Sequence, residues 1–277
     1  MLGLEVAFSS MAAPAAKRSV GRGAKWKSCI MSEPSLNGKV AIVTGAGRGI
    51  GRAIALAYAQ AGAAIGCAAR TSAEIDETVQ KIQSLGGQSV AVQTDVTQLE
   101  SVQHLLATVV EHFGGLDILV INAGGSYDPR NVEDSHSEDW QATLQVNLVG
   151  AYYCAHAAIP YLKQRGAGKI ITIGSGLGHR GQAGGSAYAC SKAGLWMLTR
   201  VLAQELWPHN ISVNELIPGP VKTTIDDPQP SASSRNLGFE SEWVKTPEEV
   251  TGLALFLAMQ PDIGPTAQSF SLMRRDN

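Results

Sequence analysis

The hydrophobic pattern of this chain alternates between two periods. Short runs rich in Val, Ile and Ala lie at 39–45, 63–70, 88–95, 116–124, 168–176 and 210–219. The longer stretches between them carry apolar residues at helical spacing. The continuous apolar run from Ile118 to Ile121 suits a strand that is buried on both faces, as in a parallel sheet. This alternation predicts an α/β protein with a single-domain Rossmann fold, built on a doubly wound parallel sheet of about seven strands.

Two of the expected helices have further signals. Ser135 and Glu138 have the spacing of a capping box, just before a helix expected over 140–163. A second helix is expected over 186–207 and ends at Pro208. It repeats leucine at helical spacing, at Leu195, Leu198, Leu202 and Leu206. Apolar residues on its other faces predict burial by the sheet or by a partner subunit.

The overall composition excludes several classes of partner. Lys and Arg total 22 and Asp and Glu total 24, a net charge of -2, which argues against a nucleic-acid-binding protein. No apolar run approaches the length that spans a bilayer, so no membrane partner is expected. The four cysteines form no C-x-x-C pair and have no neighbouring His at ligand spacing. We therefore expect no metal site and a reducing, cytoplasmic location.

Two segments differ from the rest of the chain. Residues 1–37 hold many small and basic residues, and we interpret them as a disordered extension before the domain at 38–277. A transit-like arm and an alternative start at Met31 are the other interpretations. The segment 220–245 is rich in Pro, Ser, Asp and Asn, which predicts a mobile lid over the substrate.

A glycine-rich sequence joins the first strand to the first helix. "TGAGRGIG", residues 44–51, has the spacing T-G-x-x-x-G-x-G rather than G-x-G-x-x-G. Glycines at this junction let the backbone approach a pyrophosphate, whose charge is favoured at a helix N-terminus. A purely structural turn is the other interpretation.

The end of the second strand predicts which dinucleotide is bound. The usual fingerprint has an acidic residue there that accepts hydrogen bonds from the adenosine ribose. This chain has Ala69 instead, followed by Arg70, and Arg48 lies in the glycine-rich loop. A guanidinium matches a phosphate bidentately, so NADP(H) is preferred and NAD(H) is the second choice. Arg70 as a solvated loop charge is the alternative.

Tyr188 and Lys192 lie four residues apart in the helix expected over 186–207, so both side chains project from one face. A phenol is a poor acid or base at neutral pH, but a nearby ammonium favours the phenolate and lowers the phenol pKa. The pair would then exchange a proton with a carbonyl or alcohol oxygen while a nicotinamide carries the hydride.

Taken together, these motifs resemble the short-chain dehydrogenase/reductase family over residues 39–259, most closely its 3-oxoacyl-acyl-carrier-protein reductases. The motifs occur in the family's order: "TGAGRGIG" at 44–51, Asp95 in "TDVT", "NAG" at 122–124, Asn147 in "VNL", Ser175 after "IITIG", Tyr188, Lys192, and "PG" at 218–219.

The resemblance implies four catalytic residues. Ser175 would hold the substrate oxygen and Tyr188 would transfer the proton. Lys192 would lower the tyrosine pKa and bind the nicotinamide ribose, and Asn147 would fix a water of the proton relay. Asp95 would touch the adenine, and Thr223, or its neighbour Thr224, the carboxamide. The implied cofactor-binding residues are Gly45, Gly47, Arg48, Gly49, Ile50, Gly51, Arg70, Asp95, Val96, Asn122, Ala123, Gly124, Tyr188, Lys192, Pro218, Gly219, Val221 and Thr223.

The resemblance also implies a homodimer or homotetramer built on the helices expected near 140–163 and 186–207. Departures from the family pattern bear on substrate and assembly. The segment after "NAG" and the C-terminal "SFSLMRRDN" both differ from the family's usual text. The resemblance implies an enzyme that reduces a ketone or 3-oxoacyl thioester with NADP(H). The first alternative is an NAD(P)-dependent dehydrogenase of a sugar, polyol or steroid alcohol, and the second is a non-catalytic dinucleotide sensor. His179, between Ser175 and Tyr188, is interpreted as a structural or solvated residue.

Overall fold

The computed structural model describes residues 35–223 and 243–273. Seven parallel strands form one sheet in the order β3-β2-β1-β4-β5-β6-β7. The strands are β1 (Val40–Thr44), β2 (Ala64–Ala69), β3 (Ser89–Gln93), β4 (Ile118–Ile121), β5 (Gly168–Ile173), β6 (Ile211–Ile217) and β7 (Ser269–Ser271). The predicted Rossmann sheet is therefore confirmed, and its order reverses between β1 and β4.

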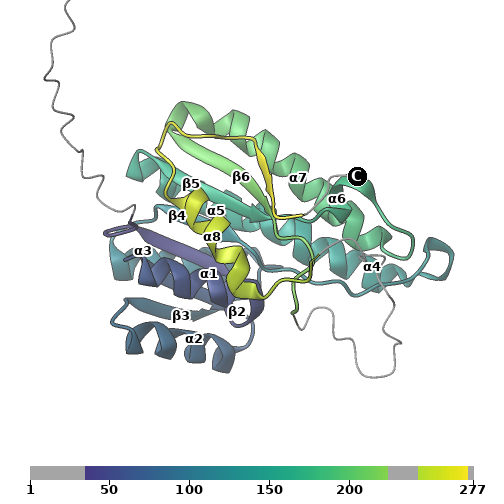
Figure 1. Cartoon of the computed structure of the whole chain (residues 1–277), viewed down its shortest axis with the longest axis horizontal. Coiled ribbons are helices and arrows are strands. Elements are labelled where there is room, and N and C mark those ends of the chain that lie inside the picture. Colours follow the sequence, from purple (N-terminus) through teal and green to yellow (C-terminus); the bar gives the residue numbers. More distant parts are fainter. Residues whose placement is uncertain (1–34, 224–242, 274–277) are drawn as a thin grey trace, which may run out of the picture. The chain divides into compact units, whose positions relative to one another are not determined.

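Helices cover both faces of this sheet (Figure 1). One face packs against α1 (Gly49–Gln60), α2 (Ser72–Ser84) and α8 (Thr251–Ala258). The other packs against α3 (Leu99–Phe113), α5 (Gly150–Arg165) and α7 (Ser186–Leu206). Because side chains alternate along a strand, Ile42 joins the α3/α5/α7 core while Ala41 and Val43 join the opposite one. Both cores are apolar, as the continuous hydrophobic runs predict.

The helix expected over 140–163 is a continuous helical stretch of three parts. It comprises α4 (Ser137–Leu144), a π-helical turn over Gln145–Val149, and α5. The expected capping box at Ser135 and Glu138 does not form, because α4 begins later, with His136 at its N-cap position and no side-chain cap. A capping box does form between Thr246 and Glu249, before α8. The sequence motif therefore predicted a capping box at the start of the wrong helix.

Three observations bear on the predicted boundaries of the domain and of its lid. Leu36 is 2% exposed and packs in the core, with its N–H bonded to the carbonyl of Ala61, so the packed domain begins before residue 38. Most of the proposed extension, 1–34, lies outside the described residues, as does 224–242 of the proposed lid. The two ends of the proposed lid pair with each other. The Lys222 N–H donates to the Lys245 carbonyl, and the Lys245 N–H donates to the Pro220 carbonyl.

Candidate active site

The glycine-rich loop at 44–51 has the backbone conformation that its glycines predict. Gly45 and Gly49 have φ of +67° and +54°, values that favour glycine. A Cβ at Gly51 would overlap the carbonyl of Gly45, so this glycine permits close packing of α1 on the loop. The N-cap residue of α1, Arg48, makes no side-chain cap bond, and the first turn holds no acidic residue. The helix N-terminus therefore offers backbone N–H groups and a favourable dipole to an anion.

This loop forms one wall of an open cleft at the carboxyl ends of β1, β2 and β4. Eleven of the predicted cofactor-binding residues line it: Gly45, Gly47, Arg48, Gly49, Ile50, Arg70, Val96, Asn122, Ala123, Gly124 and Thr223. Sequence reasoning did not include six other lining residues: Ala69, Thr71, Glu74, Thr94, Tyr127 and Val146. Small residues beside a bare helix N-terminus suit a dinucleotide at the switch point of the sheet.

The other predicted cofactor residues are not among those that line this cleft. They are Gly51, Asp95, Tyr188, Lys192, Pro218, Gly219 and Val221. The Asp95 carboxylate accepts bonds from the N–H and hydroxyl of Thr97. Its assignment to the adenine therefore remains a prediction. Thr224, the alternative to Thr223, lies outside the described residues.

The charges in the cleft are of both signs. Arg48 Nη1 lies 3.6 Å from Oε1 of Glu74 in α2, and both side chains are substantially exposed. Arg70 is exposed at the end of β2 and also lines the cleft. A phosphate bound between these arginines would compete with Glu74 for Arg48. Glu74 is the one carboxylate among the lining residues. The dinucleotide fingerprint predicts an acidic residue only at the end of the second strand, and it missed Glu74 because this residue lies on α2.

Asn122 and Thr44 join the ends of the two central strands. The Asn122 side-chain amide donates to the Thr44 carbonyl at 2.8 Å, and the Thr44 hydroxyl accepts the N–H groups of Asn122 and Ala123 at 3.0 Å. Asn122 therefore holds the loop after β4 against the loop after β1, where the cleft opens.

The expected proton-transfer pair lies on α7. Lys192 is buried, its Nζ lies 5.7 Å from the centre of the Tyr188 ring, and it donates to the carbonyl of Ile173 at 2.8 Å. Burial lowers the pKa of Lys192 to about 8, against a smaller opposite effect of the Glu215 carboxylate. The helical spacing of the two residues thus places an ammonium beside a half-buried phenol.

Asn147 lies in the π-helical turn and is almost completely buried. Its amide nitrogen donates to the Gly125 carbonyl at 2.8 Å and to the Ser191 hydroxyl at 2.9 Å, and its Oδ1 accepts the Gly125 N–H. Asn147 therefore connects the loop after β4 to α7, one residue before Lys192. Such a turn often marks a functional site. Its proposed contact with a relay water remains a prediction.

Ser175 follows β5 at the same edge of the sheet and is half-buried, with its hydroxyl accepting the N–H of Leu177 at 3.3 Å. The next residue, Gly176, leaves room for Met273, because a Cβ there would overlap the Met273 sulfur. Met273 also lies 3.3 Å from a Cβ placed on Gly219 of the "PG" motif. Met273, in the unusual C-terminal segment, therefore packs against the residue that follows Ser175.

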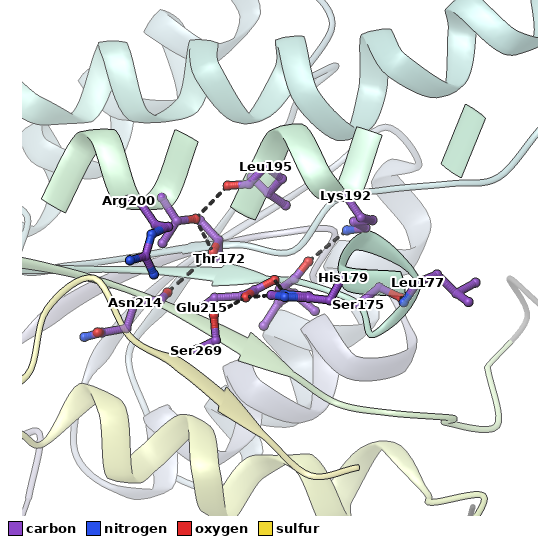
Figure 2. Close-up of polar contacts among 12 residues, drawn as sticks. Thr172, Ser175, Leu177, His179, Lys192, Leu195, Arg200, Asn214, Glu215 and Ser269 are labelled. Atoms are coloured by element: carbon purple, nitrogen blue, oxygen red, sulfur yellow. Dashed lines mark hydrogen bonds and ion pairs between the residues drawn. The ribbon is translucent and has the colours of Figure 1, made fainter. Parts of the chain in front are cut away.

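A polar cluster on the other side of Ser175 is the main feature that sequence reasoning missed. Glu215 in β6 is buried and accepts bonds from His179 and Ser269 (Figure 2). His179 is thus paired with an acid, as a structural residue would be. An acidic residue inside the expected strand "ISVNELI" was the available signal.

The described residues hold no group of three or more His, Cys, Asp or Glu side chains that could bind a metal ion. Among them, Cys67, Cys154 and Cys190 are free thiols, and burial raises the pKa of Cys67 and of Cys154 to about 12. No helix in the described part of the chain is long and apolar enough to cross a bilayer.

Fold and site together define a Rossmann-type nucleotide-binding domain with a tyrosine–lysine pair on α7. The short chain dehydrogenase family model matches residues 39–233. A short-chain dehydrogenase/reductase of Armillaria gallica is 38% identical over 85% of this chain and 94% of its own length. A 3-oxoacyl-[acyl-carrier-protein] reductase of Synechocystis is 35% identical over 86% and 96%. The chain belongs to the short-chain dehydrogenase/reductase family, whose members are NAD(P)-dependent oxidoreductases.

Similar proteins differ in what they act on. A short-chain dehydrogenase/reductase from Mycobacterium marinum has a crystal structure that matches with a TM-score of 0.80 at 35% identity, covering 86% of this chain and 94% of that one. Glucose 1-dehydrogenase 2 of Bacillus subtilis is 33% identical over 81% and 89%. The structure of an NAD+-bound xylitol dehydrogenase matches with a TM-score of 0.80 at 27% identity, over 86% and 98%. The proteins similar to this chain therefore include a 3-oxoacyl-[acyl-carrier-protein] reductase, a glucose dehydrogenase and a xylitol dehydrogenase.

Proposed function

We propose that this protein is an NADP(H)-dependent oxidoreductase that reduces a ketone or a 3-oxoacyl thioester to the alcohol, with Tyr188 as the proton donor. The observation that carries the mechanism is the buried Lys192 ammonium beside the Tyr188 ring. An ammonium there favours the phenolate that remains once the proton has left. The nicotinamide cofactor, when bound, supplies the hydride.

The chain's own residues supply the remaining roles of the proposed mechanism. The Ser175 hydroxyl would donate to the substrate oxygen, stabilising the charge that develops there. Asn147 would hold α7 in place through Ser191, so that Tyr188 and Lys192 keep their orientation. The cleft residues, with Thr223 at one end, would hold the dinucleotide. A non-catalytic sensor would not need Asn147, Ser175, Tyr188 and Lys192 together, which argues against that alternative.

The NADP(H) preference is supported by the positive side chains in the cleft. Arg48 and Arg70 line it, while Ala69 offers no carboxylate to a ribose. The Glu74 carboxylate lies close to Arg48, so the preference for NADP(H) over NAD(H) is smaller than two arginines without an acidic neighbour would give. Changing Arg70→Ala should raise KM for NADPH by about tenfold, roughly the value of one lost phosphate contact, and leave KM for NADH nearly unchanged.

The control for that experiment is Arg180→Ala, which removes an arginine from the short helix α6 (Leu177–Arg180), outside the cleft. Steady-state kinetics with both coenzymes measures the effect. An equal rise of KM for NADPH and NADH in Arg70→Ala would contradict the proposed contact with a 2′-phosphate.

The substrate class is tested by a panel of activity assays. NADPH and NADH oxidation is followed with acetoacetyl thioesters, simple ketones and diketones, and the reverse reaction with sugars, polyols and steroid alcohols. NADPH-linked reduction of thioesters or ketones supports the proposal. Turnover only with NAD and a sugar or polyol would support the dehydrogenase alternative, which the resemblance to the glucose and xylitol dehydrogenases favours.

The Tyr188→Phe variant tests the mechanism with whichever substrate responds. Loss of the phenolic proton should lower kcat by at least about a hundredfold, while coenzyme binding is retained. Tyr153→Phe, a tyrosine of α5 outside the site, is the matched control. A Tyr188→Phe enzyme with substantial activity would overturn the proposed mechanism.

Two further properties belong to the same proposal. We place the protein in the cytoplasm, which its free thiols support, and we expect a homodimer or homotetramer built on α4–α5 and α7. Exposed apolar side chains on α5 and α7 support the second point, namely Tyr152, Met197 and Val201.

A further inference from the structure

A buried acid lies outside the coenzyme cleft, in the strand next to the one that carries Ser175. Glu215 of β6 pairs in register with Thr172 of β5, and its side chain is 1% exposed. It points to the face of the sheet that is covered by α7, because Val213, two residues earlier, belongs to that core. A carboxylate in such a place costs free energy unless other groups stabilise it.

Three elements supply groups to this carboxylate. His179 of α6 (Leu177–Arg180) places Nε2 3.0 Å from Oε2 and 3.3 Å from Oε1. Ser269 of β7 donates its hydroxyl to Oε2 at 2.5 Å. On the β5 side, a Cβ at Gly174 would overlap Oε1, so the carboxylate fills the space beside the residue that precedes Ser175. The acid is therefore held against the backbone that presents the catalytic serine.

Lys192 of α7 approaches the same backbone. Its Nζ donates to the carbonyl of Ile173, the residue before Gly174. Figure 2 shows this bond close to the Glu215 carboxylate and its partners. Burial lowers the pKa of Lys192, and the negative charge of Glu215 opposes that effect. Among the described residues, the charged or titratable groups found to act on this carboxylate are His179 and Lys192.

We propose that Glu215 is a positioning residue of the proton-transfer site, whose carboxylate, held by His179 and Ser269, keeps Lys192 protonated beside Tyr188. The inference rests on the proposed roles of Tyr188 and Lys192. It deepens them by naming the group that offsets the cost of burying the ammonium.

Removing this negative charge has two effects of the same sign. The Lys192 ammonium loses a stabilising neighbour, so it loses its proton at a lower pH. The Tyr188 phenolate loses a repelling neighbour, so it forms at a lower pH. In alcohol oxidation the active form has a phenolate and an ammonium, and both limbs of the bell-shaped pH profile should move to lower pH.

The experiment compares Glu215→Gln with the parent protein. The amide keeps the size and one acceptor of the carboxylate. In the pH profile of kcat for alcohol oxidation, we expect both limbs to move to lower pH by roughly 1 pH unit. Glu205→Gln makes the same chemical change at an exposed position of α7 and should leave the profile in place. Glu215→Asp retains the charge, so its limbs should stay near the parent values even if kcat falls.

A second readout needs neither coenzyme nor substrate. Ultraviolet difference titration of the parent against Tyr188→Phe isolates the Tyr188 phenol, and in the Glu215→Gln background the phenolate should form at lower pH. Should Glu215→Gln fail to fold, His179→Gln is the second variant, at a side chain that is 31% exposed. It removes the imidazole that holds the Glu215 carboxylate in place, so the carboxylate is less firmly held and the Tyr188 phenolate should form at lower pH, as in Glu215→Gln.

The outcomes separate the inference from the proposed function. An active Tyr188→Phe enzyme overturns the proposed function, whatever Glu215 does. With Tyr188→Phe inactive, a Glu215→Gln enzyme whose limbs do not move, or a Glu215→Asp enzyme whose limbs move equally far, overturns the inference, because packing rather than charge would then be the role of Glu215.

Discussion

At the scale of single residues, the burial of the Lys192 ammonium acts against the stability of the fold. Its ammonium is buried with one carbonyl partner found, and burial lowers its pKa from 10.5 to about 8. The unfolded chain therefore binds its proton more tightly than the folded chain does. Below pH 8 both states are protonated and the burial cost is fully present, and the cost is relieved as the pH rises from 8 toward 10.5.

This gives a prediction for Lys192→Met. The folded parent protein should gain stability relative to this variant as the pH rises from about 8 toward 10.5, by up to about 3 kcal/mol. Chemical unfolding of both proteins at several pH values measures the difference. Lys163→Met, at an exposed position of α5, is the control and should show no such slope. A constant difference between parent and Lys192→Met would contradict the perturbed lysine.

Other site residues show what sequence patterns determine. Tyr188 and Lys192 lie on one helix, so their spacing alone places them side by side. Gly45 and Gly49 adopt the positive φ that a turn of this kind requires. Glu74 and Glu215 meet their partners from elements that are distant in the sequence, and no local spacing reports such contacts.

At the scale of elements, the packing of β5 beside β6 depends on a glycine that faces a glutamate side chain. Gly174, just after β5, has no side chain where the Glu215 carboxylate of β6 lies. The two positions pack as one unit, so changes at them should not be additive.

A double-mutant cycle tests this coupling. Gly174→Ala should destabilise the protein by about 1–3 kcal/mol, because the new methyl group meets the carboxylate. In a Glu215→Ala background the same change should cost less than about 0.5 kcal/mol, since the space is then free. Unfolding of the four proteins by denaturant gives the coupling free energy. Equal costs of Gly174→Ala in both backgrounds would show that the two residues do not share this space.

At the scale of the whole molecule, α7 has two apolar residues that the described part of the chain leaves substantially exposed. Leu195, Leu202 and Leu206 are buried as their spacing predicts, but Met197 and Val201 are 49% and 42% exposed. The sheet therefore covers one face of the helix, and the proposed partner subunit would cover another.

The assembly is tested by Met197→Glu combined with Val201→Glu. Charges on an apolar interface cost more than the contacts they replace, so we expect the oligomer to dissociate into monomers. Size-exclusion chromatography with light scattering measures the mass. Leu85→Glu, at an exposed apolar residue after α2, is the control and should keep the parent mass. A parent protein that is already a stable monomer would refute the proposed assembly.

The sequence by itself determined the sheet, the helix that carries Tyr188 and Lys192, and the glycine-rich loop. Each of these depends on residues close together in the chain, through strand and helix periodicity or backbone freedom. It also carried the family motifs in order. The tertiary structure alone decided the pairing of Glu215 with His179 and Ser269, the ion pair of Arg48 with Glu74, and the packing of Met273 against Gly176. Those contacts join residues far apart in the chain, and only folding brings their charges and volumes together.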